Sequence, residues 1–348
     1  MGVDREMVRL LRLLFKWFRD TFKCPGNRIV IVISLSLLLS AGCSGPSESP
    51  PDNTQGISMR YFGAAGWEIV SSTASNSDSI IVLVDPYLTR AKYANPETWD
   101  PNDDRPNFTR EDTIFSDVEL IDREISKADY ILIHHAHPDH IMDTPYIAKK
   151  TGAVVVGHET TINILRAYDV PENQLITVRG GEDYQFEDMS VRVIPSLHSP
   201  LNDKRYYQSQ VVGMEAVAPL KISQLVEGGS LMFLLRIGGE EIVTMGSMNF
   251  IEKEINGLRP SIALVGAAPS HLEIQNYTER LMEGLGFPPV VITTHADNYR
   301  TPYGSPMAKV REDWVLPFIE EVREASPTTE VIVPEHLKVI EFPPTGGF

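Results

Sequence analysis

The sequence predicts a single α/β domain in which two β-rich layers are covered by helices. The chain has 348 residues, of which 42% are hydrophobic and 22% charged, a composition typical of ordinary globular proteins. From residue 57 onward, short apolar strands alternate with helical segments in both halves of the chain. Four of the nine histidines fall within residues 134–140, directly after a predicted strand. Such a cluster indicates a chemical site at the end of a sheet.

The first 56 residues predict a leader and a tether. Residues 1–28 are rich in Arg and Lys, and an uncharged apolar run follows at 29–42, directly before Cys43. This order is typical of a signal peptide, and the run is shorter than the about 20 residues of a transmembrane helix. The residues LSAGC resemble a bacterial lipobox, in which the cysteine becomes lipid-modified, so residues 1–42 are predicted to be a lipoprotein signal peptide. An uncleaved N-terminal anchor is the alternative, and the Ser/Pro-rich residues 43–56 predict a flexible tether.

Charge and cysteine content narrow the function classes. The chain has 31 Lys and Arg residues against 47 Asp and Glu residues, a formal net charge of −16, with no basic block in the globular part. Nucleic acid is therefore not expected as a partner. Both cysteines precede residue 57, which excludes a disulfide framework. Either interpretation of the N-terminus places the globular part in the bacterial cell envelope, at the periplasmic or outer side of a membrane, with the lipid on Cys43 as the expected anchor.

The first half of the globular part (57–348) begins with strands and then alternates. Strands are predicted at 57–63, 66–72, 79–88, 128–135 and 153–158. Helices are predicted at 119–128, 145–152 and 159–170. Residues 89–112 are polar and contain three prolines, so they predict a long loop. Asp85, followed by a proline, is expected at a strand tip.

The second half repeats the same pattern. Strands are predicted at 189–199, 230–239, 240–248, 261–268, 288–295, 330–335 and 336–342. Helices are predicted at 251–258, 276–286 and 314–326.

The segment HHAHPDH (134–140) carries the predicted chemistry. On an extended segment His135 and His137 point to the same side, and Pro138 then breaks the strand. Asp139 and His140 can face the same cavity from the following turn. Imidazole and carboxylate at this density predict a site for zinc or a similar divalent metal. His134 lies on the opposite strand face and is expected to pack or to form a hydrogen bond.

The pattern HxHxDH resembles the signature of the metallo-β-lactamase-fold hydrolases. Asp85 in LVDPYL, His198 in VIPSLHSP and His295 in VITTHADN match further positions of that family in the same order. The resemblance implies a four-layer αββα sandwich with two metal sites, whose expected ligands are His135, His137 and His198 for the first metal and Asp139, His140 and His295 for the second. DPYL and HADN also resemble the branch that contains ascorbate-phosphate lactonase and N-acyl-phosphatidylethanolamine phospholipase D.

One position departs from the family pattern. The family usually has Gly-Asp where this chain has Gly246 and Ser247, and a serine hydroxyl is not an anionic bridge at neutral pH. Two metals without a protein bridge, or a single metal, are the open outcomes. Asp85 is expected to orient a ligating histidine, and Asp297 is expected to act similarly or to cap a loop. The segment at 204–207 predicts either a lid for an anionic group or an ordinary surface loop.

The resemblance implies a metal-dependent hydrolase that uses one or two Zn²⁺ ions, with Mn²⁺ or Fe²⁺ as alternatives. Three neutral imidazoles leave a coordination position open, where bound water ionises near neutral pH. A metal-bound hydroxide would attack an ester, lactone, amide or phosphodiester, with a small molecule or a lipid as substrate and with Asp139 and His198 as catalytic candidates. A phospholipase-D-like phosphodiesterase, a β-lactamase and a non-catalytic metal-binding or scaffold lipoprotein are the alternatives.

Replacing the predicted lipidation site tests the leader. A Cys43→Ser protein is expected to leave the membrane fraction, because the acidic globular part has no basic patch that would hold it to anionic lipid. Fractionation by ultracentrifugation measures the loss, with Cys24→Ser as the matched control that stays attached. If Cys43→Ser sediments with the membrane as wild type does, a lipid on Cys43 is not what holds the protein there, and the uncleaved N-terminal anchor becomes the better interpretation.

Overall fold

The predicted sandwich is present in the part of the chain that the structure describes. This computed structural model describes residues 56–72, 79–93, 100–200 and 204–343, all within one compact unit, Asp52–Phe348. The predicted leader with Cys43, and the predicted tether apart from Gly56, lie outside the described residues. Among the described residues, none of the helices has both the length and the apolar character that a membrane crossing needs.

The first sheet has seven strands in the order β14-β1-β2-β3-β4-β5-β6. Its members are β1 (Ile57–Gly63), β2 (Gly66–Ser72), β3 (Ser79–Val84), β4 (Tyr130–Leu132), β5 (Val154–His158), β6 (Leu175–Val178) and β14 (Val339–Phe342). Pairing is antiparallel from β14 to β3 and parallel from β3 to β6. The carboxyl ends of β3 and β4 therefore meet at one edge of the sheet.

The second sheet repeats this arrangement with the order β13-β12-β11-β10-β9-β8-β7. Its members are β7 (Asp183–Gln185), β8 (Met189–Ser196), β9 (Ser230–Ile237), β10 (Glu240–Met245), β11 (Ile262–Gly266), β12 (Val290–Thr294) and β13 (Glu330–Ile332). Pairing is antiparallel from β7 to β10 and parallel from β10 to β13.

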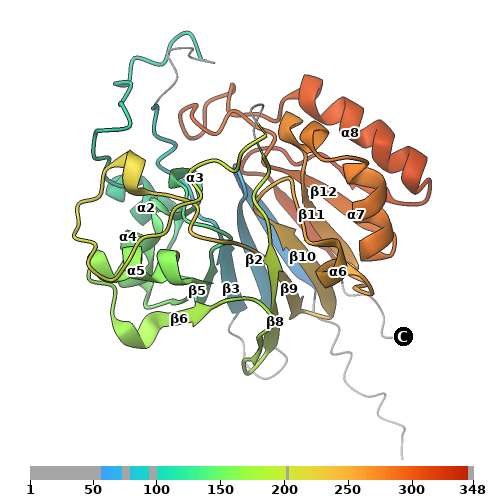
Figure 1. The fold of residues 1–348 in the computed structure, drawn as a ribbon, viewed down its shortest axis with the longest axis horizontal. Helices are drawn as coiled ribbons and strands as arrows, with labels where there is room; N and C mark the ends of the chain where they lie inside the picture. Colours follow the sequence, from blue (N-terminus) through green and yellow to red (C-terminus); the bar gives the residue numbers. More distant parts are fainter. Residues whose placement is uncertain (1–55, 73–78, 94–99, 201–203, 344–348) are drawn as a thin grey trace, which may run out of the picture. The chain divides into compact units, whose positions relative to one another are not determined.

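Helices cover the outer face of each sheet and complete four layers (Figure 1). The first sheet is covered by α2 (Val118–Glu124), α4 (Thr144–Thr151) and α5 (Glu159–Ala167), and the second by α6 (Glu252–Ile255), α7 (Tyr277–Leu285) and α8 (Glu312–Ala325). The short helix α3 (Pro138–Ile141) follows β4, and the 3₁₀ turns are η1 (Glu172–Gln174), η2 (Ile222–Gln224) and η3 (Pro269–Glu273). The predicted four-layer αββα class is confirmed.

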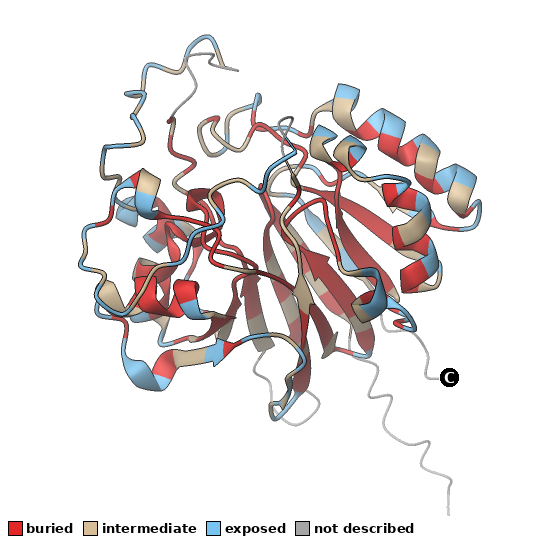
Figure 2. Cartoon of the chain, in the orientation of Figure 1, coloured by how far each residue is buried: buried red, intermediate tan, exposed pale blue. Residues whose placement is uncertain are grey.

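Two apolar layers flank the first sheet, because successive side chains of a strand point to opposite faces. Val82 and Val84 of β3 join the core between the sheets, whereas Leu83 joins the cluster beneath the helices. Figure 2 shows the same division, with the strands mostly buried and the helices buried mainly on their inner sides. Trp67 Nε1 donates to Thr294 Oγ1 at 3.1 Å, which links β2 of the first sheet to β12 of the second.

Several predicted strands end earlier than expected, and three of these ends, after β3, β4 and β12, lie beside the site. The strand expected to reach His135 stops at Leu132, and the expected turn at 138–141 is the helix α3, which starts with Pro138. Asp85 and His295 have φ angles of 40° and 53°, in the left-handed region that ends a strand. The short strands β6 and β7 were not predicted, since three or four residues carry too little alternation to detect.

Candidate metal centre

The six predicted ligand side chains lie around one cavity of about 340 Å³. They come from both sheets: the loop after β4 and α3 supply four of them, and the loops after β8 and β12 supply the others. Their ligand atoms form two groups of three, and the atoms of each group lie within 4.8 Å of one another: His135, His137 and His198, and Asp139, His140 and His295.

The first group consists of three imidazoles. Nε2 of His135 lies 3.0 Å from Nδ1 of His137, and the ring of His198 stands edge-on to both, with centroids 4.9 and 4.8 Å away. The Nδ1–H of His198 donates to the carbonyl oxygen of Ser199 at 2.8 Å, which leaves the lone pair on Nε2. The group therefore presents lone pairs for one cation.

Burial keeps these imidazoles neutral. It lowers the pKa of His135 and His137 well below the usual value, and neighbouring imidazoles lower both further. Burial also lowers the pKa of His198 to about 4, although its hydrogen bond to Ser199 opposes the change. Neutral imidazole is the form that binds a metal, so protons compete weakly at neutral pH.

The second group combines one carboxylate with two imidazoles. Oδ2 of Asp139 lies 3.3 Å from Nε2 of His295 and 3.7 Å from Nε2 of His140. Burial disfavours the charge on Asp139, but His140 and His295 outweigh it and hold the pKa of this carboxyl well below its usual range. Asp139 is therefore an anionic ligand candidate.

Asp85 supports this group from behind. Its Oδ2 accepts from Nδ1–H of His140 at 2.6 Å, which leaves the Nε2 lone pair of His140 for the cavity. The same oxygen accepts from Nδ1–H of His134 at 2.5 Å, and Thr244 donates to the Nε2 of His134 at 2.9 Å. Despite burial, which acts in the opposite direction, His134 and His140 lower the pKa of Asp85 to about 2. These bonds place Asp85 as a positioning residue.

Ser247 lines the cavity and also holds the loop that carries His198. The backbone N–H of Ser199 donates to Ser247 Oγ at 3.0 Å, and Asn249 Nδ2 donates to the carbonyl oxygen of His198 at 3.1 Å. The preceding residue must be glycine, because a Cβ at Gly246 would lie 2.3 Å from the Cβ of His134.

Of the two roles expected for Asp297, the structure shows the capping of a loop. Its carboxylate accepts from the backbone N–H of Ala64 at 2.8 Å and from Nη2 of Arg90 at 2.9 Å, and both side chains of the ion pair are fully buried. Arg90 also donates to the carbonyl oxygens of Phe62, Asn298 and Thr301. Asp297 therefore ties the β1–β2 turn to the loop that carries His295, rather than orienting an imidazole.

Both groups fit divalent cations by the chemistry of their donors. Three neutral imidazoles match a catalytic zinc site with an open position, and a carboxylate with two imidazoles suits a second borderline metal. By contrast, Asp85, His134 and His140 also lie together, but the carboxylate and both Nδ1 atoms are already joined by hydrogen bonds. That third group is a support rather than a metal site.

Sequence reasoning missed two cations and three aromatic residues of the cavity, the third being Trp314. Arg110, Arg300, Tyr93 and Tyr299 line it together with Tyr207, which lies in the segment considered as a lid. Lys204 of that segment pairs instead with Glu273 at the exposed surface. Arg300 could have been found from the sequence, because it follows the ligand candidate His295 by five residues in the same loop. Arg110 lies in the long polar loop, where no sequence feature marks it as a site residue. His158, His271 and His336 do not line this cavity.

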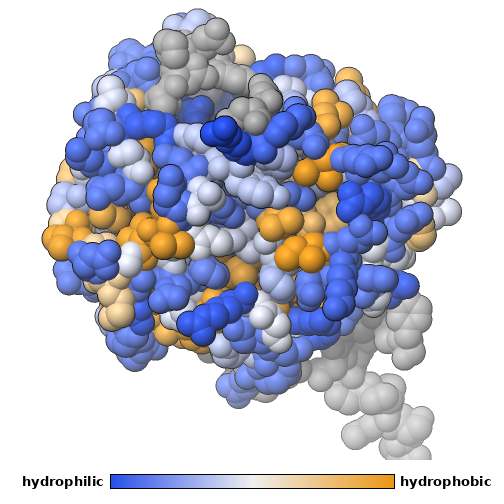
Figure 3. Space-filling model, in the orientation of Figure 1, coloured by the Kyte–Doolittle hydropathy of each residue, from blue (hydrophilic) through white to orange (hydrophobic). Residues whose placement is uncertain are grey.

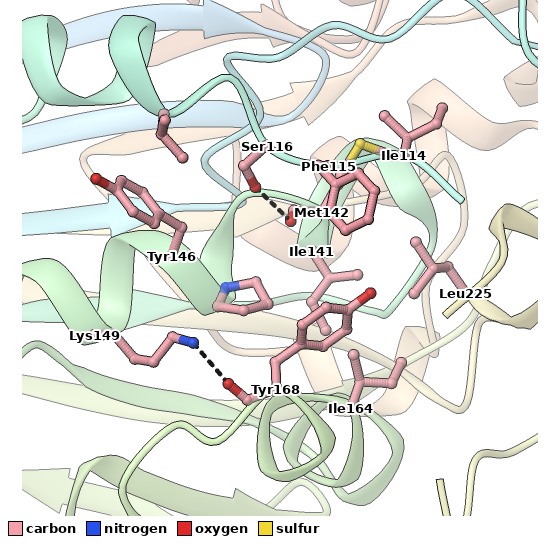
Figure 4. A pocket seen from close by; sticks show the side chains of 12 residues that line it. Ile114, Phe115, Ser116, Ile141, Met142, Tyr146, Lys149, Ile164, Tyr168 and Leu225 are labelled. Atoms are coloured by element: carbon pink, nitrogen blue, oxygen red, sulfur yellow. Dashed lines mark hydrogen bonds between the residues drawn. The ribbon is translucent and has the colours of Figure 1, made fainter. Parts of the chain in front are cut away.

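A separate apolar cavity of about 200 Å³ lies beside α4 and α5 (Figure 4). Its polar groups already have partners, since Lys149 Nζ donates to the Tyr168 carbonyl oxygen at 2.8 Å and Ser116 Oγ to that of Met142 at 3.2 Å. This second cavity therefore offers no free acid, base or ligand.

Comparison with known proteins agrees with this geometry. A beta-lactamase superfamily domain matches residues 82–219. A metallo hydrolase from Ignicoccus hospitalis has a similar structure, with a TM-score of 0.51 at 19% identity over 82% of this chain and 98% of that one. The chain has the metallo-β-lactamase fold.

Curated relatives of this metallo-β-lactamase-fold chain are named UPF0173 metal-dependent hydrolases. One from Thermococcus onnurineus is 33% identical over 42% of this chain and 51% of its own length. One from Staphylothermus marinus is 28% identical over 59% of this chain and 81% of its own length. The chain spans about half the length, or less, of the curated relatives that it matches at 30% identity or more. The lactonase and phospholipase D branch stays a prediction.

Neutralising Asp85 tests its support of the second group. An Asp85→Asn protein is expected to bind the second metal about 10- to 100-fold more weakly, because an amide is a poorer acceptor for His140 Nδ1–H. Metal content measured by mass spectrometry across a chelator titration gives the affinity. Asp122→Asn, at an exposed Lys150 pair, is the control. An unchanged chelator midpoint in Asp85→Asn would show that the carboxylate does not set metal affinity.

Restoring the family's usual aspartate tests the departure at Ser247. In wild type the second metal is expected to dissociate before the first, since it lacks one anionic ligand. A Ser247→Asp protein is expected to hold the second metal more tightly, because the new carboxylate is paired with cations rather than stranded. The same chelator titration measures both steps. Equal midpoints with two metals retained in both proteins would mean that residue 247 is not at the bridging position.

Proposed function

We propose that this protein is a metal-dependent hydrolase with two divalent cations, zinc first among the candidates, bound in the cavity between the sheet ends. The observation that carries the proposal is the convergence of two complementary donor groups in one cavity, one of three neutral imidazoles and one with an ionised carboxylate. Structural zinc sites use all four coordination positions, whereas each group here supplies three. Open positions favour chemistry over structural support.

The site residues have different roles in this proposal. The two ligand groups would hold divalent cations, which, when bound, would supply hydroxide at neutral pH and polarise the oxygen of a carbonyl or phosphoryl group. His135, His137 and His198 hold lone pairs because burial keeps them unprotonated. Asp139 Oδ2, which remains ionised and faces Nε2 of His295, is able to act as an anionic ligand and to orient water by accepting a hydrogen bond from it. Asp85 fixes the ring of His140, so that its Nε2 faces the cavity.

A site of this kind can hydrolyse esters, lactones, amides and phosphodiesters. A test of the function must therefore include substrates with each of these bonds. A phospholipase-D-like phosphodiesterase and a β-lactamase are narrower versions of the same proposal. A non-catalytic metal-binding or scaffold lipoprotein is the alternative of another class. We also propose that the lipid on Cys43 anchors the protein in the bacterial cell envelope, where it would meet a small molecule or a lipid.

A turnover assay on the metal-loaded protein tests the proposal. Wild type is expected to hydrolyse at least one member of a panel of ester, lactone, phosphodiester and β-lactam substrates, with rates that disappear on chelation and return with Zn²⁺. His137→Ala is expected to fold but to lose at least about 10²-fold in rate, because the first metal is left with two imidazoles. His336→Ala, outside the cavity, is the matched control.

Two results would contradict the proposal. Full metal occupancy and unchanged rates in His137→Ala would remove this residue from the first site. Binding of two metals without turnover of any substrate would favour the non-catalytic alternative.

A further inference from the structure

Two arginines line the metal cavity, and each lies against aromatic rings. The guanidinium carbon of Arg300 is 4.5 Å from the ring centroid of Tyr93 and 4.9 Å from that of Tyr299. That of Arg110 is 4.7 Å from the ring centroid of Tyr207. Cation–π contacts of this kind hold the plane of a guanidinium without using its N–H groups. Arg300 also forms a side-chain hydrogen bond with Tyr93, so Nη1 of Arg110 and Nε of Arg300 are the donors that these contacts leave to a ligand.

The aromatic rings set these arginines beside the two ligand groups. Tyr207 lies 5.6 Å from His137 of the first group, measured between ring centroids. Tyr299 lies 5.6 Å from His295 of the second group. Each ligand group thus has an aromatic ring beside it, and a guanidinium lies against that same ring.

Unused hydrogen-bond donors distinguish these two arginines from a structural one. Nη1 of Arg110 and Nε of Arg300 are buried and have no hydrogen-bond partner among the described residues. In Arg90, by contrast, Nε, Nη1 and Nη2 all donate, and Nη2 also pairs with Asp297 at 2.9 Å. A buried charged donor without an acceptor is costly, so an unmet pair of such donors in a cavity indicates that a ligand supplies the acceptors.

The net charge of the cavity lining also favours an anionic ligand. Its acidic side chain is Asp139, which the second metal would engage, whereas two guanidiniums face the same space. Bound divalent cations would add further positive charge. An anion entering this cavity gains from all of these charges, while a cationic substrate is repelled.

We propose that Arg110 and Arg300 form a subsite for an oxyanion, a carboxylate or a phosphate, carried by the substrate. The inference rests on the proposed hydrolase function and defines its substrate class as anionic. Guanidinium forks match the two oxygens of such a group, and the surrounding rings exclude water and strengthen the bonds. In the reaction, water adds to the carbonyl carbon or phosphorus, the bond to the leaving group breaks, and the leaving atom departs with a proton. The subsite holds the remote anionic end in place.

Matched esters test the carboxylate. In the metal-loaded protein, para-nitrophenyl butyrate is compared with mono-para-nitrophenyl glutarate, which differs by a terminal carboxylate. Wild type is expected to have the lower KM for the glutarate ester. Arg110→Met and Arg300→Met are each expected to reduce this preference about 10-fold or more, as for loss of a charge-assisted hydrogen bond. Arg323→Met, at an exposed helical pair with Glu320, is the control that keeps it.

If Arg110→Met and Arg300→Met both keep the wild-type preference for the glutarate ester, the proposed subsite is wrong. If Arg300→Met does not fold, Arg300→Lys replaces it. This variant keeps the positive charge but loses the planar guanidinium, so its preference for the glutarate ester is expected to be weaker than that of wild type without being abolished, because Lys binds as a point charge.

Calorimetry with inorganic phosphate tests the phosphate and separates this inference from the proposed function. The Arg110→Met/Arg300→Met double variant is expected to bind phosphate at least about 10-fold more weakly than wild type, with both proteins metal-loaded. Equal affinities would mean that phosphate contacts the metals alone, which contradicts the subsite. If wild type hydrolyses nothing but the double variant still loses phosphate affinity, the hydrolase proposal fails and the anion subsite stands.

Discussion

The buried carboxylate of Asp85 is the constraint on which the geometry of the site depends. It follows β3 of the first sheet and accepts three hydrogen bonds, from the backbone and Nδ1 of His134 and from Nδ1 of His140. His134 in turn accepts from Thr244 of β10 in the second sheet. A single anion thus joins the sheets and fixes the ring of a ligand candidate. A buried charge is stable only when its hydrogen-bonding capacity is used, as it is here.

Local patterns were enough to predict two β-rich layers covered by helices and the candidate donors of residues 134–140, whereas His198 and His295 became candidates through the family resemblance. Strand alternation places Val82 and Val84 on one face of β3, and HxHxDH places four candidate donors on one short segment. The two arginines of the cavity could not be predicted in the same way. Arg110 reaches the cavity from a long loop, 25 residues before His135, and its position depends on contacts such as Ser223 N–H to the Arg110 carbonyl oxygen at 2.8 Å. Such long-range contacts leave no periodic trace in the sequence.

The serine at position 247 is compatible with this arrangement. Its hydroxyl accepts from the backbone N–H of Ser199 and donates to Ser199 Oγ, at 3.0 and 3.3 Å. A carboxylate could accept the first bond but could not donate the second. Ser247 therefore positions the loop of His198 as a neutral group, and the cost is one anion fewer among the candidate ligands of the second metal. The same loss leaves the cavity more positive.

The positive charge of the cavity is opposite in sign to the net charge of the whole chain. The protein carries a formal −16, and the face seen in Figure 3 is mainly hydrophilic with separate hydrophobic patches. Such a surface gives an anion no long-range attraction, and at physiological salt its field is screened within about 8 Å. Inside the cavity the balance reverses, since the two arginines of the lining outnumber its one carboxylate, Asp139, and act at short range and low dielectric. Recognition of an anionic substrate would therefore arise after entry, from Arg110 and Arg300, rather than from steering at the surface.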